Sequence, residues 1–90
     1  MSISKVGVVG GGTMGSGIAE VSAKSGCDTI VVEVDASLAE LAQQKLEQST
    51  EKAVAREKMT EEDRGNLLSK LSFTTEYSEL ADRDLVIEAV

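Results

Sequence analysis

A glycine-rich segment near the start of the chain constrains the fold more than any other feature. The residues Gly10-Gly11-Gly12-Thr13-Met14-Gly15 fit the pattern G-x-G-x-x-G, and they directly follow the apolar run Lys5-Val6-Gly7-Val8-Val9. A short valine-rich run bounded by glycine is typical of a strand buried on both faces, and therefore of a parallel sheet. The pattern predicts a strand that ends in a tight turn and leads into a helix.

The residues after the glycines are predicted to complete a strand–helix–strand unit. Helical spacing of apolar residues continues over residues 13–25, and Gly26 stands where a glycine commonly ends a helix. The β-branched run Thr29-Ile30-Val31-Val32-Glu33-Val34 predicts a second strand. The helix positions expected to face the core are Met14, Ile18, Val21 and Ser22 or Ser25. Such a unit joins two parallel strands through one helix.

A helical hairpin is predicted to follow the second strand. Asp35 or Ser37 can cap its first helix, which continues toward Arg56, and Thr60 begins a second helix with acids in its first turn. The positions expected to face the core are Leu38, Leu41, Ala42, Lys45, Leu46 and Ser49 in the first helix, and Leu67, Leu68 and Leu71 in the second.

The last third of the chain predicts two further strands. Residues 72–75 read as a short strand, residues 77–81 as a turn, and residues 84–90 as another buried strand. The alternating order predicts an α/β fold, namely a Rossmann-type doubly wound parallel sheet with the helical hairpin after its second strand. Such sheets usually have about six strands and only about four are predicted here, so we expect an incomplete sheet.

Each glycine of the motif has a separate physical role in binding a dinucleotide. Gly10 permits the tight turn, Gly12 lets the backbone approach a pyrophosphate, and Gly15 lets the helix pack closely on the strand. The pyrophosphate would then face the N–H groups and the positive dipole end of the helix. A plain strand-to-helix turn is the alternative, and the surrounding strand–helix–strand pattern favours the dinucleotide.

Two acids compete for the ribose of that dinucleotide. Glu33 follows Gly15 by 18 residues and Asp35 follows it by 20, so the usual spacing of about 20 does not separate them. Asp35 is favoured as a helix cap, which leaves Glu33 as the ribose ligand. A carboxylate there accepts hydrogen bonds from ribose hydroxyls and repels a 2′-phosphate, so NAD is preferred over NADP.

Composition narrows the class of protein. The net charge of −7 argues against a nucleic-acid partner, because phosphate binding needs clustered basic residues. No apolar run approaches the roughly 20 residues that span a bilayer, and no secretory signal is seen, so we expect a soluble, cytoplasmic protein without a membrane partner. Cys27 is the single cysteine and is expected to be a packing residue. Histidine is absent, so we assign no catalytic residue, and we assign no metal ligand.

The chain resembles the NAD-binding domain of L-3-hydroxyacyl-CoA dehydrogenases, particularly the bacterial 3-hydroxybutyryl-CoA dehydrogenases. The resemblance covers nearly all 90 residues and is most specific in residues 6–19 and 84–90, with the helical hairpin as a third mark. It implies NAD as the cofactor, with Glu33 at the ribose and Ala89 beside the nucleotide. The motif residues that it implies as cofactor contacts are Gly10, Gly12, Thr13, Met14 and Gly15.

The resemblance also implies a substrate and a reaction. In the family, a hydroxyl and a basic residue seven positions apart in the hairpin contact coenzyme A, which corresponds to Ser49 and Arg56. The implied reaction is reversible oxidation of an L-3-hydroxyacyl-CoA, with hydride passing to the nicotinamide. The family's histidine base and its glutamate partner would lie beyond Val90, so residues 1–90 are expected to be the N-terminal part of the NAD-binding domain. The helical domain that forms the homodimer would be absent from this chain.

Two other functions remain open from the sequence. One is a related dehydrogenase that acts on a 3-hydroxy acid without coenzyme A, against which the helical hairpin argues. The other is a non-catalytic module that binds NAD as a sensor. Turnover with and without the coenzyme A moiety distinguishes the first, and NADH binding without turnover of any acyl-CoA would indicate the second.

Overall fold

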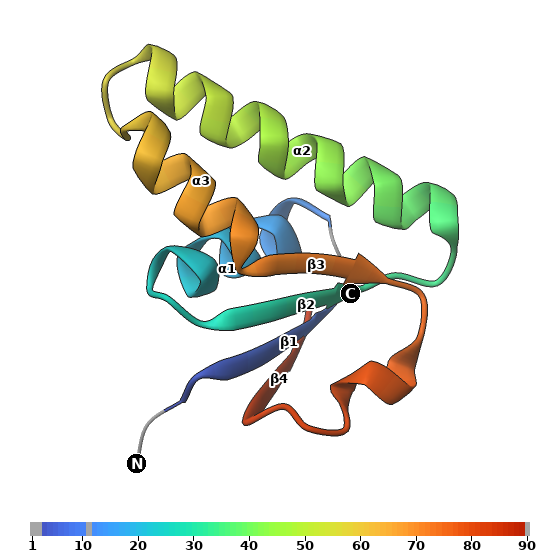
Figure 1. Cartoon of the computed structure of the whole chain (residues 1–90). Coiled ribbons are helices and arrows are strands. Elements are labelled where there is room, and N and C mark those ends of the chain that lie inside the picture. The colour runs from blue at the N-terminus through green and yellow to red at the C-terminus, as the bar shows by residue number, and fades with distance from the viewer. Residues whose placement is uncertain (1–2, 11, 90) are drawn as a thin grey trace.

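The computed structural model describes residues 3–10 and 12–89, and of Thr13 the backbone alone. These residues form a parallel sheet of four strands with helices packed on it (Figure 1). The elements in chain order are β1 (Lys5–Val9), α1 (Thr13–Lys24), β2 (Asp28–Val32), α2 (Ala36–Ala55), α3 (Glu61–Ser69), β3 (Leu71–Thr74), the 3₁₀ turn η1 (Tyr77–Leu80) and β4 (Leu85–Glu88). The predicted α/β fold class and the helical hairpin are confirmed.

The order of the strands decides where a ligand can bind. The sheet runs β3-β2-β1-β4, with every described pairing parallel. The chain therefore moves outward from β1 to β3 and then returns to the far side of β1 for β4. Open α/β sheets bind ligands beyond the carboxyl ends of their strands, at the point where the order reverses. In this sheet that point lies between β1 and β4.

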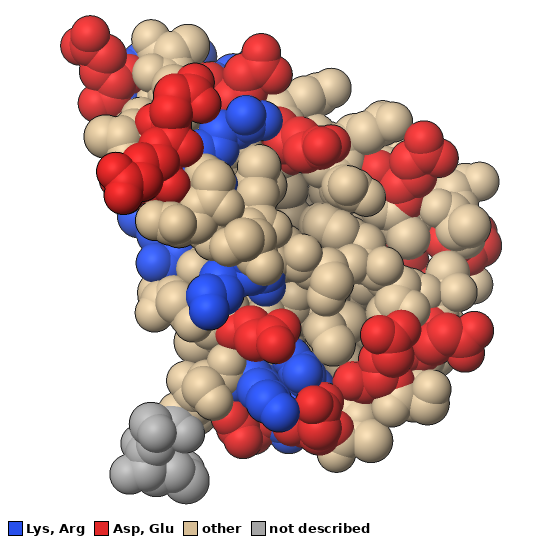
Figure 2. Space-filling view, viewed as in Figure 1, with Lys and Arg blue, Asp and Glu red and all other residues tan. Residues whose placement is uncertain are grey.

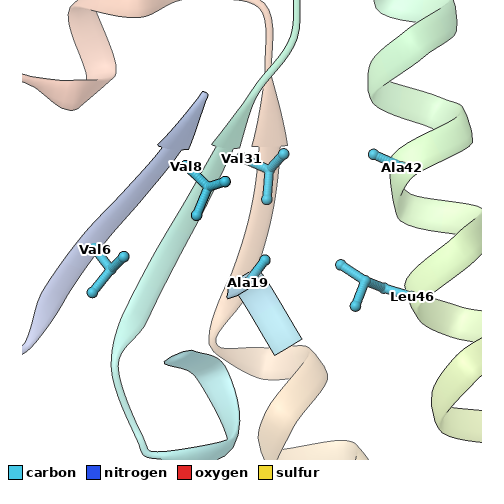
Figure 3. Close-up of a cluster of buried hydrophobic side chains, with 6 residues drawn as sticks. All are labelled: Val6, Val8, Ala19, Val31, Ala42 and Leu46. Atoms are coloured by element: carbon cyan, nitrogen blue, oxygen red, sulfur yellow. The ribbon is translucent and has the colours of Figure 1, made fainter. Parts of the chain in front are cut away.

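The hydrophobic core lies between one face of the sheet and the helices α1, α2 and α3 (Figure 3). Alternate residues of β1 and β2 point to this face because successive side chains of a strand point to opposite sides. The buried cluster consists of Val6, Val8, Val31, Ala19, Ala42 and Leu46. Cys27 packs against it as a partly buried side chain, as predicted for a packing residue.

Local end signals of the helices are confirmed. Asp35 caps α2 by accepting a hydrogen bond from the Leu38 N–H at 2.9 Å, and Thr60 caps α3 by accepting one from the Asp63 N–H at 3.0 Å. Gly26 has φ +92° directly after α1. Its N–H donates to Ala23 O, and the N–H of Cys27 donates to Ser22 O, both at 3.0 Å, which is the Schellman arrangement.

The predicted core faces of α1 and α2 are partly wrong. Met14 and Val21 are 68% and 65% exposed, and the buried positions of α1 are Gly15, Ala19 and Ala23. In α2, Leu38, Leu41, Lys45 and Ser49 are exposed, while Ala39, Ala42, Leu46 and Thr50 are buried. In α1, the small residues lie one helical turn apart and let the helix approach its neighbours closely, and that close approach turns Met14 and Val21 outward.

The last strand, which was predicted to be buried, is largely exposed in the described part of the chain. β4 lies at the edge of the described sheet, and its Leu85 and Val86 are 41% and 43% exposed. The strand spans residues 85–88, shorter than the predicted 84–90, and Val90 lies outside the described residues. β2 likewise ends at Val32 rather than Val34, which places Glu33 after the strand. Leu71 belongs to β3 and not to the helix before it.

Candidate functional site

Three segments that are distant in sequence meet at the carboxyl edge of the sheet. They are the glycine-rich turn after β1, Glu33 after β2 and Ala89 after β4. Backbone hydrogen bonds continue the sheet into them: Ala89 N donates to Val9 O at 2.8 Å, Gly10 N to Val32 O at 2.9 Å and Glu33 N to Thr74 O at 2.9 Å. The structure thus brings together the motif, the acid and the last-strand residue that the sequence singled out.

Two glycines of the turn are required by the protein itself. Gly10 is buried and has φ +96°, a conformation that residues with a Cβ rarely adopt. A Cβ at Gly15 would overlap the carbonyl oxygen of Gly10 and contact Ala89 Cβ at 3.5 Å. These two positions let α1 start directly after the end of β1, with Ala89 beside Gly15.

Gly12 differs, because nothing in the described protein requires a glycine there. Its φ of −68° suits any residue, it is exposed, and a Cβ on it would meet no atom within 4 Å. It is the N-cap of α1, and its carbonyl accepts from Ser16 N at 2.8 Å. Gly12 therefore stands exposed at a helix N-terminus, where the first N–H groups lack partners within the helix and the dipole favours an anion.

The two candidate acids, Asp35 and Glu33, differ in their hydrogen bonding. Asp35 is committed to the cap of α2, as the sequence favoured. Glu33 is half-buried at the end of β2, and its carboxylate makes no hydrogen bond or ion pair with another described residue. Its lone pairs are therefore available to a ligand that reaches this edge.

Ser49 and Arg56 share a surface hollow on α2, away from the glycine-rich turn. The hollow has a volume of about 340 Å³ and is lined by Lys45, Gln48, Ser49, Lys52, Ala53, Arg56 and Lys58. Seven residues are nearly two helical turns, which places Ser49 and Arg56 on one side of the helix. We call this surface the α2 hollow.

Ser49 also has a partner that the sequence did not reveal. Its hydroxyl donates to Glu20 Oε1 at 2.9 Å, across from α2 to α1. A carboxylate can only accept, so the hydroxyl proton is committed to Glu20. Toward the hollow Ser49 consequently offers acceptor lone pairs, which suit an N–H or O–H group of a ligand rather than a phosphate.

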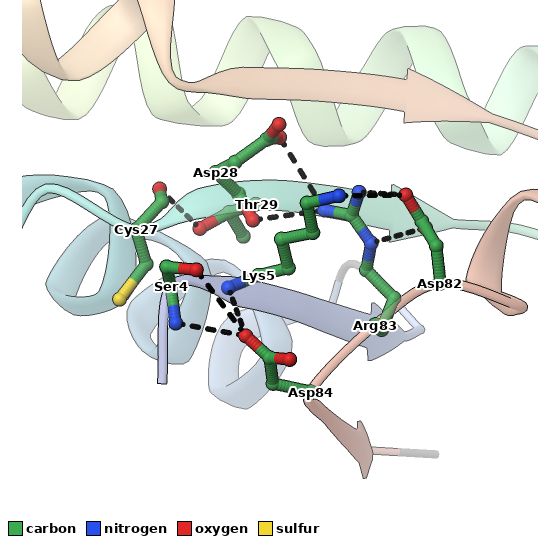
Figure 4. Close-up of polar contacts among 8 residues, drawn as sticks. All are labelled: Ser4, Lys5, Cys27, Asp28, Thr29, Asp82, Arg83 and Asp84. Carbon is green, nitrogen blue, oxygen red and sulfur yellow. Dashed lines mark hydrogen bonds and ion pairs between the residues drawn. The ribbon is translucent and has the colours of Figure 1, made fainter. Parts of the chain in front are cut away.

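A polar network at the amino edge of the sheet was missed by the sequence reasoning (Figure 4). Arg83 donates to both carboxylate oxygens of Asp82 at 3.0 and 3.1 Å and to Asp28 O at 3.0 Å. Lys5 forms an ion pair with Asp82 at 3.2 Å. The Asp-Arg-Asp run before β4 was the only signal in the sequence, and it did not show which strands its side chains would reach.

This network fixes the start of β4 against β1 and β2. The Asp84 carboxylate accepts from the N–H groups of Ser4 and Lys5, each at 3.0 Å, and these bonds hold its pKa below the ordinary value. Hydrogen bonds from Arg83 and then Lys5 lower the pKa of Asp82 to about 2. The bond to Asp82 in turn raises the pKa of Arg83, whose side chain is only 4% exposed.

Across residues 3–10 and 12–89, no helix is long and apolar enough to cross a membrane. Within the same ranges, no three acidic, cysteine or histidine side chains are grouped as metal ligands would be.

Comparisons with known proteins agree with this geometry. Residues 5–90 match the family described as 3-hydroxyacyl-CoA dehydrogenase, NAD binding domain. A 3-hydroxybutyryl-CoA dehydrogenase of Mycobacterium tuberculosis is 48% identical over 89 residues, which are 99% of this chain and 31% of that protein. The crystal structure of M. tuberculosis FadB2 superposes with a TM-score of 0.98 at 48% identity, covering 100% of this chain and 32% of the other.

A second solved structure extends the likeness. The (S)-3-hydroxybutyryl-CoA dehydrogenase PaaH1 from Ralstonia eutropha has a TM-score of 0.94 at 35% identity, over 99% of this chain and 31% of that one. The chain thus spans about a third of the length of these relatives.

Proposed function

Since this chain belongs to the family of NAD-binding domains of 3-hydroxyacyl-CoA dehydrogenases, we propose that the whole protein interconverts L-3-hydroxyacyl-CoA and 3-oxoacyl-CoA. The substrate we favour is short, of the 3-hydroxybutyryl-CoA type, because relatives with that name match nearly the whole of this chain. Within that protein, residues 1–90 recognise the cofactor NAD and one end of the substrate.

The observation that carries the proposal is the open space at Gly12. Gly10 and Gly15 are explained by the fold, whereas Gly12 leaves room in front of the α1 N-terminus that no described residue uses. A diphosphate fits that place, since it needs backbone N–H groups at close approach. The other cofactor contacts of this turn are Thr13 and Met14, which belong to the first turn of α1, and Ala89 beside it.

The role of Glu33 is to bind the adenosine ribose. Its carboxylate has no partner among the described residues, stands after β2 and would accept hydrogen bonds from both ribose hydroxyls. The charged side chains at the right-hand edge of Figure 2 are acidic. That charge would repel the additional phosphate of NADP, so NAD is the cofactor that this edge prefers.

The chemistry is divided between this chain and the rest of the protein. When bound, NAD supplies the acceptor or donor of the hydride, and the residues above fix its position. Ser49 and Arg56 hold the coenzyme A of the substrate on the α2 hollow, with Arg56 facing a phosphate and Ser49 a hydrogen-bond donor. We assign the general base of the reaction to another part of the protein.

The remaining features of the whole protein are part of the same proposal. They are a homodimer formed through a C-terminal helical domain outside residues 1–90, a cytoplasmic location, and no nucleic-acid or membrane partner. The acidic balance of the printed sequence supports the absence of a nucleic-acid partner.

Calorimetry and turnover with the whole protein test this function. We expect NADH to bind at least tenfold more tightly than NADPH, and acetoacetyl-CoA to be reduced with NADH. Equal turnover of a 3-oxo acid without coenzyme A would favour the related dehydrogenase, and NADH binding without turnover of any acyl-CoA would favour the sensor. Unchanged NADH affinity in a Gly12→Val variant would contradict the assignment of the glycine-rich turn.

A further inference from the structure

The basic side chains of this acidic protein are unevenly distributed. Of the nine lysine and arginine residues, Lys5, Arg64 and Arg83 make side-chain hydrogen bonds or ion pairs. The other six have no such partner among the described residues, and all of them line one of two hollows on the helices: Lys24, Lys45, Lys52, Arg56, Lys58 and Lys70. Unpaired positive charge is thus concentrated in a chain whose net charge is −7.

One hollow is the α2 hollow described above, and the other lies between the end of α1, the α2–α3 turn and α3. The second, which we call the α1–α3 hollow, has a volume of about 320 Å³. It is lined by Ala23, Lys24, Gly26, Lys58, Met59, Asp63, Asn66, Leu67 and Lys70. Ala23 and Leu67 are buried and form its floor. Figure 2 shows basic side chains on the left of the view, where Figure 1 draws the α1–β2 turn and the lower end of α3.

Two of the three lysines of the α1–α3 hollow stand at helix C-termini, since Lys24 lies in the last turn of α1 and Lys70 is the C-cap of α3. Three basic residues, Lys24, Lys58 and Lys70, line this hollow together with one acidic residue, Asp63. A helix C-terminus favours a cation, and at the end of α1 the carbonyl groups of Ala23 and Ser22 also accept hydrogen bonds from the N–H groups of Gly26 and Cys27. The hollow therefore carries more basic than acidic side chains, and its three lysines have no ion-pair partner among the described residues.

We propose that the α1–α3 hollow is a binding site for a phosphate group, carried either by coenzyme A or by a free phosphorylated metabolite. Lysine ammonium groups bind phosphate as compact charges with several donors, and Asn66 adds a neutral amide at the rim. The volume is at the lower end of the range for small-molecule pockets, so one or two phosphate groups are the part of a ligand that would be held.

Lys58 links this hollow to the α2 hollow, because it lines both. Coenzyme A carries a diphosphate and a separate 3′-phosphate, and therefore has more than one anionic group to place. A single molecule lying across Lys58 would use both hollows, which makes coenzyme A the favoured source. That choice rests on the function proposed above, whereas the phosphate site itself does not.

The test uses the whole protein saturated with NADH, so that the glycine-rich turn is occupied. Lys24 and Lys70 are exposed and line only the α1–α3 hollow, so the variant is Lys24→Gln/Lys70→Gln. The control is Gln43→Glu/Gln44→Glu, which lowers the net charge by the same two units at exposed positions away from both hollows. Calorimetry measures the affinity of each for inorganic pyrophosphate, and kinetics measures KM for acetoacetyl-CoA and for acetoacetyl-pantetheine, which has no phosphate.

We expect the lysine variant to bind pyrophosphate about fivefold more weakly than the wild type, from two exposed contacts of roughly 0.5 kcal/mol each. The control should change less than twofold. Equal pyrophosphate affinity in the lysine variant and the wild type would overturn the proposal. A KM raised for acetoacetyl-CoA and not for acetoacetyl-pantetheine identifies coenzyme A as the source, and an unchanged KM with weakened pyrophosphate binding identifies a free metabolite. Failure of the wild type to reduce either thioester would refute the proposed function alone, because the pyrophosphate measurement still decides the site.

Discussion

The two edges of this sheet use polar groups in opposite ways. At the amino edge, Asp82, Arg83 and Asp84 bond to the beginnings of β1 and β2, and the Arg83 side chain is nearly inaccessible. At the carboxyl edge, the carboxylate of Glu33 has no partner among the described residues. A Cβ added at Gly12 would meet no described atom within 4 Å. Groups that the protein leaves unsatisfied are available to a ligand, and groups that it satisfies hold the strands in place. We propose that the polar side chains of the amino edge hold the strands in place, and that those of the carboxyl edge are left for a ligand.

The largest expected effect comes from closing the contact between the turn and α1. In Gly15→Ala the new Cβ overlaps the backbone oxygen of Gly10, so the free energy of unfolding should fall by ~3 kcal/mol. Gly17→Ala is the matched control, because its Cβ meets nothing within 4 Å and alanine is the better helix former by up to ~1 kcal/mol. Urea unfolding of both variants measures the contrast. Equal stabilities would show that the turn is not packed as described.

A serine at Gly12 would separate recognition from stability at the carboxyl edge. Serine is a favourable N-cap, so Gly12→Ser should leave the free energy of unfolding unchanged or raise it by up to ~1 kcal/mol. The same side chain would occupy the space that the diphosphate needs, and NADH affinity should fall about tenfold, which is ~1.4 kcal/mol. Calorimetry and thermal unfolding give the two numbers. A loss of stability equal to the loss of affinity would argue against an edge reserved for a ligand.

Replacing Glu33, the acid after β2, tests the ligand-binding role of the carboxyl edge further. Glu33→Gln keeps the shape but removes the charge that strengthens hydrogen bonds to ribose, so NADH should bind several-fold more weakly, by ~1 kcal/mol. The preference for NADH over NADPH should narrow because the repulsion of the 2′-phosphate is lost. Asp35→Asn is the control, since asparagine caps a helix equally well and Asp35 is bound to the Leu38 N–H. An effect of Asp35→Asn on cofactor preference would reverse the assignment of the two acids.

The smallest effect is expected at the amino edge, and it depends on pH. The pKa of Asp82 is lowered to about 2 from an ordinary value of 3.8, so its contribution to stability is complete above pH 3.8. It is lost as the pH falls from that value to about 2, because the unfolded chain then binds a proton that the folded chain does not. Asp82→Asn should flatten this part of the pH profile of the urea midpoint. A variant with the slope of the wild type would show that the ion pairs with Arg83 and Lys5 are not formed in solution.

Local signals in the sequence predicted much of the fold and of the site. The glycines of the turn, the caps at Asp35 and Thr60 and the helix end at Gly26 each depend on a few neighbouring residues, and the structure has all of them. The sequence offered Asp35 or Ser37 as the cap of α2, and the structure has Asp35 there, which separates that residue from Glu33. The family resemblance placed Ser49 and Arg56 on one helix, and the structure puts them in one hollow.

Packing between elements was not predictable in the same way. Met14 and Val21 fitted a helical stripe, yet the helix turns Gly15, Ala19 and Ala23 to the core, because only small side chains allow α1 to lie directly on β1 and β2. Periodicity shows which residues share a face, and it does not weigh close approach against hydrophobic area. The position of β4 at an edge of the described sheet likewise depends on strand order, which its own residues do not encode.

The sequence by itself determined the strand, turn and helix that form the candidate NAD site, since the backbone conformation of glycine and the capping of a helix are decided within a few residues. The tertiary structure alone decided the partners of Arg83, the bond from Ser49 to Glu20 and the gathering of unpaired lysines around the α1–α3 hollow. These contacts join residues from different elements, and side chains distant along the chain meet only when the sheet has fixed the order and the helices have fixed their faces.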